Sequence, residues 1–191
     1  MADRLPTFPE PRGTDTDDWR LMREIARGSE DAFRDLIGRY QDVLLHLFAR
    51  LGARHDEADD AAQETFLRVH AYRERYQPTG SFRTFLFTVA RRAWLDLCRR
   101  RERRRRREVP GCDLESLPRP EGLGLDRRLD LEAALNKLSE GHRMVLVLSI
   151  WGGLKYEEIA EVMGIPEGTV KSRVFHALRK LRARLSPTSA G

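Results

Sequence analysis

The residues best suited to chemistry lie near the end of the sequence, between Glu167 and Leu185. This stretch holds six lysine and arginine residues and one acidic residue, a balance that favours contact with phosphate groups. Helical spacing separates its polar side chains from an apolar side, as a helix in the DNA major groove requires. The residues that this layout assigns to base edges and phosphates are Thr169, Lys171, Ser172, Arg173, Phe175, His176, Arg179 and Lys180.

The residues just before this stretch predict a helix-turn-helix. Tyr156–Met163 has the apolar period of a short helix, Gly164 supplies a left-handed residue to end it, and Pro166 precedes the next helix. Two helices joined by a short glycine-containing turn form this DNA-binding motif. An ordinary helical hairpin with a solvated basic face shows the same spacing, so spacing alone leaves both interpretations open.

Residues arranged for catalysis are not found in the sequence. Cys98 and Cys112 form no Cys-x-x-Cys pair, and Gly152–Gly153 lacks the context of a phosphate-binding loop. The histidines are scattered, at His46, His55, His70, His142 and His176. We therefore expect no catalytic residue, no metal site and no cofactor, and we predict a binding protein rather than an enzyme. Cys98 falls in an apolar helical phase, which favours core packing.

Two groups of helical patterns must position these residues. The acidic, proline-containing residues 1–18 predict a disordered tail and lack the features of a signal peptide. Apolar residues then recur at steps of three and four, with Ser29 and Asp31 placed as a cap after Gly28. The helices expected in this first domain cover 19–37, 43–51, 59–76 and the residues from Ser81 into the arginine run at 99–107.

A change of composition separates a second domain from the first. Residues 109–127 contain prolines and glycines without periodicity and predict a flexible linker. The helical pattern resumes at about Leu129, and no strand of credible length occurs. The sequence therefore predicts an all-α fold of two small helical domains, at 19–108 and 128–186, with a tail at 187–191.

The charge of the chain favours a polyanionic partner. The 191 residues carry a formal net charge of +5, and 34% of them are charged. No apolar run approaches the roughly 20 residues that span a bilayer, so we do not expect a membrane-embedded protein. Two widely separated cysteines suit a reducing compartment, and we expect a cytoplasmic location.

Three motifs resemble one family of bacterial proteins. Leu154–Ala160 followed by Gly168–Arg173 resembles the C-terminal domain of the extracytoplasmic-function (ECF) group of RNA polymerase sigma factors. Asp59–Arg68 resembles the polymerase-binding helix of that family, and Phe82–Arg91 resembles its promoter-melting segment. The resemblance covers about residues 19–185, with the motifs in family order.

The resemblance implies a transcription initiation factor with a region 2-like bundle and a region 4-like helix-turn-helix. Such a factor binds the RNA polymerase core, recognises the −10 and −35 elements of promoter DNA, and directs a stress or envelope regulon. An anti-sigma factor is implied as a further partner. The residues implied to contact core polymerase are Asp59, Asp60, Gln63 and Glu64. For Asp59 by itself, a solvated helix N-terminus is a good explanation.

The fourth expected helix carries residues suited to an opened DNA strand. Phe87 and Trp94 lie near the edge of its apolar stripe, beside several arginines, and aromatic faces next to arginine bind single-stranded DNA. For Trp94, core packing and DNA contact remain equally open. The resemblance places the downstream element against residues 79–81 and the helix behind them. The assigned residues are Thr79, Gly80, Ser81, Arg83, Phe87, Arg91 and Arg92.

The sequence departs from the family pattern at three positions. Lys155 stands where serine or threonine usually caps the first helix of the motif, a loss of about 1 kcal/mol that Glu157 and Glu158 should partly offset. Arg92 replaces a common asparagine and His176 a common arginine, so we expect an unusual promoter sequence. A free-standing helix-turn-helix regulator remains the alternative, and it would bind its operator without polymerase.

Overall fold

The computed structural model describes residues 15–77, 80–107 and 126–185. These residues form eight α-helices and no strand, which confirms the predicted all-α fold class. The N-terminal domain consists of α1 (Asp15–Ala26), α2 (Glu30–Leu51), α3 (His55–Ala71) and α4 (Phe82–Arg107). The C-terminal domain consists of α5 (Asp126–Asn136), α6 (Glu140–Ile150), α7 (Tyr156–Met163) and α8 (Glu167–Leu185). The linker expected at 109–127 lies outside the described residues except for its last two positions, which begin α5, and the tail expected at 187–191 lies wholly outside them.

The first two helices divide at Gly28, directly before the cap that the sequence pattern predicted at Ser29. Gly28 has a φ of +92°, which ends α1, and the Ser29 hydroxyl accepts a hydrogen bond from the Ala32 N–H at 3.2 Å. The capping role predicted for Ser29 is therefore confirmed. α2 then runs unbroken to Leu51, so the predicted division between residues 37 and 43 was wrong. A single glycine there, Gly38, weakens a helix without ending it.

α1 begins at Asp15, inside the segment expected to be a disordered tail. Asp18 is only 1% exposed, and its carboxylate accepts hydrogen bonds from the Tyr40 hydroxyl and the Arg39 guanidinium of α2. Burial raises the pKa of Tyr40, which keeps the hydroxyl a donor. The boundary predicted at residue 19 was therefore too late. An acidic residue can be buried here because it finds its partners on another helix.

An apolar stripe joins α4 to the rest of its domain, as predicted. Phe82, Leu86, Ala90 and Ala93 are fully buried. Trp94, for which the sequence left two roles open, is 3% exposed and stacks on Phe48 with ring centroids 6.4 Å apart, so it belongs to the core. Cys98 packs against the same core, and burial raises the pKa of its thiol to about 11. Cys112 lies outside the described residues.

Ion pairs add a second connection between α3 and α4. The Arg101 Nε donates to Glu57 Oε1 at 2.8 Å, and these hydrogen bonds lower the pKa of Glu57 to about 2. Arg68 donates to Glu64 of its own helix at 2.7 Å and to Asp96 of α4 at 2.8 Å. α3 ends at Ala71, before the predicted end at Tyr76, and turns follow it. The α3–α4 connection is thus set by both packing and charge.

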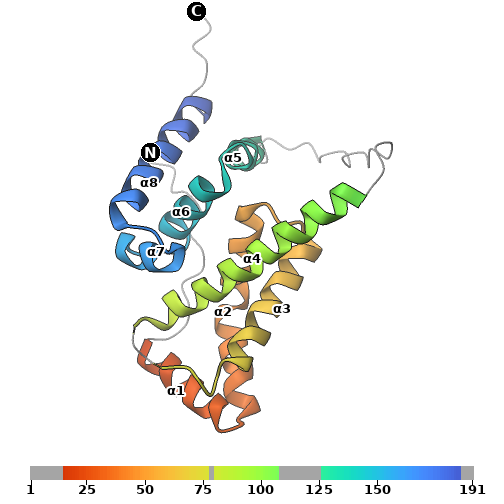
Figure 1. Ribbon diagram of the computed structural model, residues 1–191, viewed down its shortest axis with the longest axis vertical. Coiled ribbons are helices and arrows are strands. Elements are labelled where there is room, and N and C mark those ends of the chain that lie inside the picture. The colour runs from red at the N-terminus through yellow and green to blue at the C-terminus, as the bar shows by residue number, and fades with distance from the viewer. Residues whose placement is uncertain (1–14, 78–79, 108–125, 186–191) are drawn as a thin grey trace, which may run out of the picture.

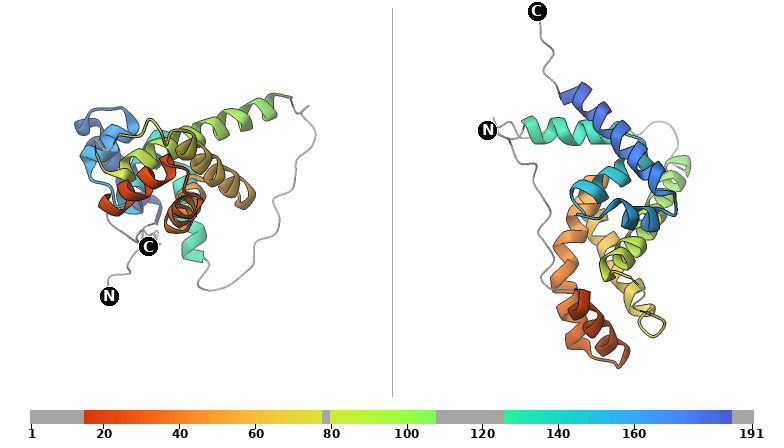
Figure 2. Two further views of the ribbon diagram at one scale, coloured as in Figure 1. Left: turned by 90° about the horizontal axis from the view of Figure 1, so that it is seen from below. Right: turned by 90° about the vertical axis from the view of Figure 1, so that its left-hand side faces the viewer.

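The two domains pack against each other, with α7 on α4 and α6 on α2 (Figure 1). Arg143 of α6 donates from Nη1 to the Leu51 carbonyl at the end of α2, at 2.6 Å. The Arg50 guanidinium lies over the Trp151 ring, 5.5 Å from its centroid. α8 lies on the outer surface of this assembly, as the second view of Figure 2 shows.

The described residues contain neither a helix that could span a membrane nor a cluster of side chains that could hold a metal ion. None of the described helices combines the length and apolar character needed to cross a membrane. Across the described ranges, histidine, cysteine and carboxylate side chains form no group of three that could hold a metal ion.

Candidate nucleic-acid and protein interfaces

The predicted helix-turn-helix is present, and both of its helices have the predicted bounds. Gly164 has a φ of +65° and ends α7, as expected for a left-handed residue after the last turn. The Ile165 N–H donates to the Ala160 carbonyl at 3.1 Å and closes that end. Pro166 then precedes α8, where its fixed φ suits the start of a helix. Local residue types therefore determine where α7 ends and where α8 begins.

α8 has one buried face and one exposed face. Val170, Val174, Ala177 and Leu181 are each at most 5% exposed. The apolar side that sequence spacing indicated is thus confirmed for Val170, Val174 and Leu181. Burial of this face fixes which side chains α8 can present to a partner.

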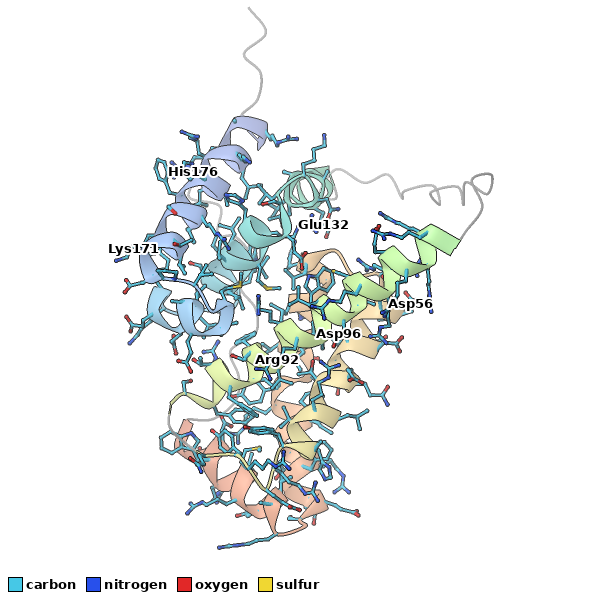
Figure 3. The ribbon with its side chains drawn as sticks, viewed as in Figure 1. Asp56, Arg92, Asp96, Glu132, Lys171 and His176 are labelled. Carbon is cyan, nitrogen blue, oxygen red and sulfur yellow. The ribbon has the colours of Figure 1, made fainter. Side chains whose placement is uncertain are left out.

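The exposed face of α8 carries most of the residues predicted to bind the upstream promoter element. Lys171, Ser172, Phe175, His176, Arg179 and Lys180 are exposed, whereas Thr169 and Arg173 are half-buried. Lys171 and His176 point outward from α8, away from the N-terminal helices (Figure 3). Phe175 is 62% exposed, a large apolar side chain among donors. Lys171 lies 2.7 Å from Glu167, so part of its charge is matched within α8.

The start of α7 lacks a side-chain cap at Lys155, as the sequence predicted. The Lys155 backbone N–H instead donates to the Glu158 carboxylate at 2.7 Å. This is one half of a capping box, and Glu157 and Glu158 both lie in the first turn, where negative charge is favourable. The compensation expected from Glu158 is therefore present in the structure.

A cavity of about 850 Å³ lies between the end of α3, the start of α4 and α7. Three aromatic rings line it, with the Phe85 ring centroid 5.7 Å from that of Tyr72 and 4.9 Å from that of Tyr76. The side chains that add charge to its wall are Arg68, Arg75, Arg92 and Glu161. Aromatic faces beside guanidinium groups suit an unstacked base and its phosphate.

Only some of the residues predicted for the downstream element lie at the cavity. Gly80, Ser81 and Arg92 line it. Arg91 is half-buried and is not among the lining residues, and Thr79 lies outside the described residues. Phe87, in contrast, is fully buried, and Arg83 donates to the Gly152 carbonyl of the other domain. Stacking of a base on Phe87 is thus excluded in this arrangement, because the side of α4 that carries it is covered.

Sequence reasoning missed the aromatic residues of the cavity. Tyr72 and Tyr76 stand just before the proline–threonine–glycine break, and Arg73 and Arg75 lie between them. The two aromatic residues flanking this basic segment were an available signal, but the helical pattern predicted that α3 continues to Tyr76. In the structure it is a turn, and the turn brings both rings beside Phe85.

The residues predicted to contact polymerase lie on the surface of α3. Asp59, Asp60 and Gln63 are exposed, and Glu64 is half-buried through its pair with Arg68. The sequence pattern of Asp59–Arg68 predicts that Phe66 and Leu67 are both buried, but Leu67 is 56% exposed. Spacing of three and four residues places Leu67 on the same face as Asp60, Gln63 and Glu64, whereas its neighbour Phe66 turns inward.

An apolar groove of about 360 Å³ runs beside that face, between α2 and α3. Its walls are Phe33, Ile37, Gln41, Leu45, Asp59, Ala62, Gln63, Phe66 and Leu67. We call the exposed side chains of Asp60, Gln63, Glu64 and Leu67, together with this groove, the α3 surface. It offers carboxylates next to apolar walls, which suits a protein helix with basic and apolar residues.

Comparison with known proteins identifies the class to which this architecture belongs. Residues 36–104 match the family described as Sigma-70 region 2, and residues 128–181 match Sigma-70, region 4. The first match contains the whole of α3 and most of α4, and the second contains the helix-turn-helix through Leu181.

Comparison with individual relatives shows which group of sigma factors the chain resembles most clearly. The chain is 35% identical to ECF RNA polymerase sigma factor SigE of Mycolicibacterium smegmatis, over 99% of this chain and 74% of the relative. It is 37% identical to ECF RNA polymerase sigma factor EcfG of Rhodopseudomonas palustris, over 81% and 86% of the two chains. The chain belongs to the family of ECF RNA polymerase sigma factors. It is a promoter-recognising factor for transcription initiation.

Solved structures agree with this assignment. CnrH, solved in complex with the cytosolic domain of CnrY, aligns with a TM-score of 0.70 and 28% identity, over 91% of this chain and 99% of that chain. The sigma factor RpoE of Bartonella quintana, solved with the anti-sigma factor NepR, aligns with a TM-score of 0.63 and 29% identity, over 81% and 99%.

Proposed function

We propose that the α3 surface is where this sigma factor binds the polymerase core. The observation that carries this proposal is the exposure of Leu67 on the same helical face as Asp60, Gln63 and Glu64. A leucine that a folded domain leaves exposed beside an apolar groove marks a surface for a partner. The carboxylates around it favour a basic partner and would set orientation and rate of association.

The cavity between α3 and α4 is proposed to receive an unstacked base of the downstream promoter element. Tyr72, Tyr76 and Phe85 provide ring faces, and stacking contributes about 1–3 kcal/mol per base. Arg92 and Arg75 would contact the backbone of the same strand. Since flipping a base costs a few kcal/mol, this step needs the polymerase to hold the DNA open.

α8 is proposed to read the upstream element in the major groove. Ser172, His176 and Arg179 present hydrogen-bonding groups, and Lys171 and Lys180 lie where they would meet phosphates. The small exposed Gly168 permits close approach at the N-terminal end of the helix. The chain itself contributes binding and positioning, while the polymerase carries the chemistry.

An anti-sigma factor is proposed as the inhibitory partner of this chain. RpoE of Bartonella quintana was solved with an anti-sigma factor, NepR. CnrH was solved with the cytosolic domain of CnrY. The apolar groove of the α3 surface would accept an amphipathic helix from such a protein. We also propose a cytoplasmic location and a stress or envelope regulon, which the family assignment supports.

Transcription with purified core polymerase tests the proposed function. We expect start sites that depend on the full chain, mapped by sequencing the transcripts from a genomic template library. Asp60→Lys is the loss-of-function variant in the same assay. It reverses one charge on the α3 surface and should abolish those starts. If the chain binds specific duplex DNA without core and the core adds no start sites, the assignment is wrong.

A further inference from the structure

Basic side chains gather where α6 packs on α8. Lys180, Arg173 and His176 of α8 are the charged and titratable groups that act on His142, in the first turn of α6. A methyl group added at Gly141 would lie 3.2 Å from the Arg173 Nη1, so this guanidinium packs against the same turn. We call His142, Arg173, His176 and Lys180 the α6–α8 basic cluster.

The carboxylates of α6 and α8 do not offset this charge in the described part of the chain. Glu167 of α8 lies 2.7 Å from Lys171 and is matched there. Glu140 of α6 acts on Cys98 and Arg143, on the side toward the N-terminal domain. Cations that are held together without a counter-ion repel one another, so a bound anion would lower the free energy of the cluster.

The other two helices that pack on α6 direct their charged groups elsewhere. α2 places the Arg50 guanidinium over the Trp151 ring. In α7, the Glu158 carboxylate accepts a hydrogen bond from the Lys155 backbone N–H at 2.7 Å, and Glu161 lines the cavity beside α4. Among the described residues, the charge of the basic cluster is therefore left for a ligand.

The His142 imidazole has one nitrogen engaged and one left to bind. Its Nδ1 lies 2.6 Å from the Ser139 hydroxyl, so Nε2 is the nitrogen that can donate to an anion. Burial, followed by the charges of Lys180, Arg173 and His176, lowers the pKa of His142 below its ordinary value of 6.5. In the free chain at neutral pH the ring is therefore mostly uncharged.

A phosphate of duplex DNA is the anion that matches the position of this cluster. His176 and Lys180 are exposed on the side of α8 that is proposed to enter the major groove, and His176 points outward in Figure 3. The backbones of both strands border that groove, so side chains on the flank of a recognition helix meet phosphates. His142 and Arg173 are half-buried beside this flank, where salt screens their charges less than at a fully exposed site.

We propose that His142 is a proton-dependent contact of the upstream duplex, whose imidazolium binds a backbone phosphate together with Arg173 and Lys180. The inference rests on the proposed function, since it assumes that α8 reads the upstream element. It adds a residue of α6 to a surface that the sequence assigned to α8 alone. The affinity for upstream DNA then depends on pH.

The direction of this pH dependence follows from the charges. A phosphate beside the imidazole favours the charged form and raises the pKa of His142, whereas the cations around it keep that pKa lower in the free chain. The DNA-bound chain therefore holds a proton that the free chain releases. Duplex binding tightens as the pH falls through the interval between the two pKa values, and the contact is lost above both of them.

A titration of duplex DNA at two pH values tests this contact in the full chain. The probe is a fluorescein-labelled 30-base-pair duplex of randomised sequence, followed by anisotropy at pH 7.5 and pH 5.5 and at constant ionic strength. The wild type should gain about two- to fivefold more affinity on acidification than His142→Gln, the range expected for one partly exposed charge contact. His55→Gln is the matched control, because it makes the same change at a histidine of α3 whose side chain is 94% exposed. His176→Gln measures the separate share of the other histidine in the cluster.

A second variant separates loss of the charge from loss of the fold. His142→Lys carries its charge at both pH values and should bind the duplex at pH 7.5 as tightly as the wild type does at pH 5.5. If His142→Gln keeps the wild-type pH dependence, another group titrates and the inference is overturned. It is also overturned if inorganic phosphate at constant ionic strength removes the pH dependence from the wild type, because the cluster then holds free phosphate rather than DNA. Absence of duplex binding at both pH values would overturn the proposed role of α8 as well, whereas binding that does not depend on His142 overturns this inference alone.

Discussion

α3 and α8 each turn one face to the molecule and the other to a partner, but they are held in place by different forces. α3 uses charged side chains for its own fold, through Glu57 with Arg101 and through Arg68 with Asp96. α8 is held by buried Val170 and Val174, with Ala177 and Leu181 further along. The acidic helix therefore shares its charges between folding and binding, whereas the basic helix keeps the two roles on separate faces.

This difference predicts how substitutions will behave in the two helices. A charge change on α3 risks lowering both stability and affinity, because Glu64 is paired with Arg68, which in turn holds α4. A charge change on the exposed face of α8 should alter DNA binding and leave stability nearly unchanged.

The largest expected effect concerns Glu57 and acid. Its pKa is lowered to about 2, chiefly by hydrogen bonds from Arg101, so the pair stabilises the fold above pH 4.5 and the gain is lost as pH falls toward 2. Glu57→Gln should cost up to about 3 kcal/mol at pH 7, by the size of that shift. Urea unfolding of both chains at pH 7 and pH 3 measures this, and the gap between them should narrow at pH 3. Asp56→Asn is the control, since Asp56 is largely exposed. If the difference in unfolding free energy between wild type and Glu57→Gln is the same at both pH values, the ionised Glu57–Arg101 pair does not stabilise the fold.

A smaller effect is expected at the α3 surface. Leu67→Ala should weaken core binding by about 2 kcal/mol, roughly thirtyfold, if Leu67 is a central contact. Its unfolding free energy should stay the same, because the side chain is exposed. Asp35→Lys changes charge on α2 outside the groove and serves as the control. If Leu67→Ala binds core with wild-type affinity in a titration, Leu67 is not part of the interface.

The same contrast explains what could be predicted from the sequence. The bounds of α7 and α8 were predicted correctly because Gly164, Pro166 and the apolar period act within a few residues of each other. Capping by Ser29 was predictable for the same reason. Local chemistry that specifies both ends of a helix can be recognised without knowledge of its neighbours.

Features that depend on distant partners were missed. Asp18 looked like part of an acidic tail because Arg39 and Tyr40 are 21 and 22 residues away. Leu67 and Phe66 are adjacent and apolar, and only the packing of α3 on α2 decides which one is buried. The hydrogen bond from Arg83 to the Gly152 carbonyl depends on packing between domains, which no local pattern encodes.

A further prediction tests whether α8 separates folding from binding. Ser172→Ala and His176→Ala should each change base preference at particular positions of the upstream element, by about 1–2 kcal/mol for a good contact. Arg184→Ala, in the last turn of α8, should weaken binding to all sequences alike and reduce its salt dependence. Selection from a randomised promoter library, with thermal unfolding in parallel, measures both. A single consensus shared by all variants, or a large loss of stability, would contradict the statement that α8 keeps folding and DNA binding on separate faces.

The smallest expected effect is a gain in stability at α7 that leaves the α3 surface and the exposed face of α8 unchanged. Lys155→Ser would supply a hydroxyl that accepts the Glu158 N–H, while the Glu158 carboxylate already accepts the N–H of residue 155 at 2.7 Å. The reciprocal pair completes a capping box, worth about 1 kcal/mol. Thermal unfolding should show a higher midpoint, with core affinity and base preference as in the wild type. In a Glu158→Gln background the gain should persist, because the amide oxygen still accepts that N–H. A gain that instead disappears with Glu158→Gln would show that the charge of Glu158 on the helix dipole, rather than the hydrogen-bonded box, stabilises this end of the motif.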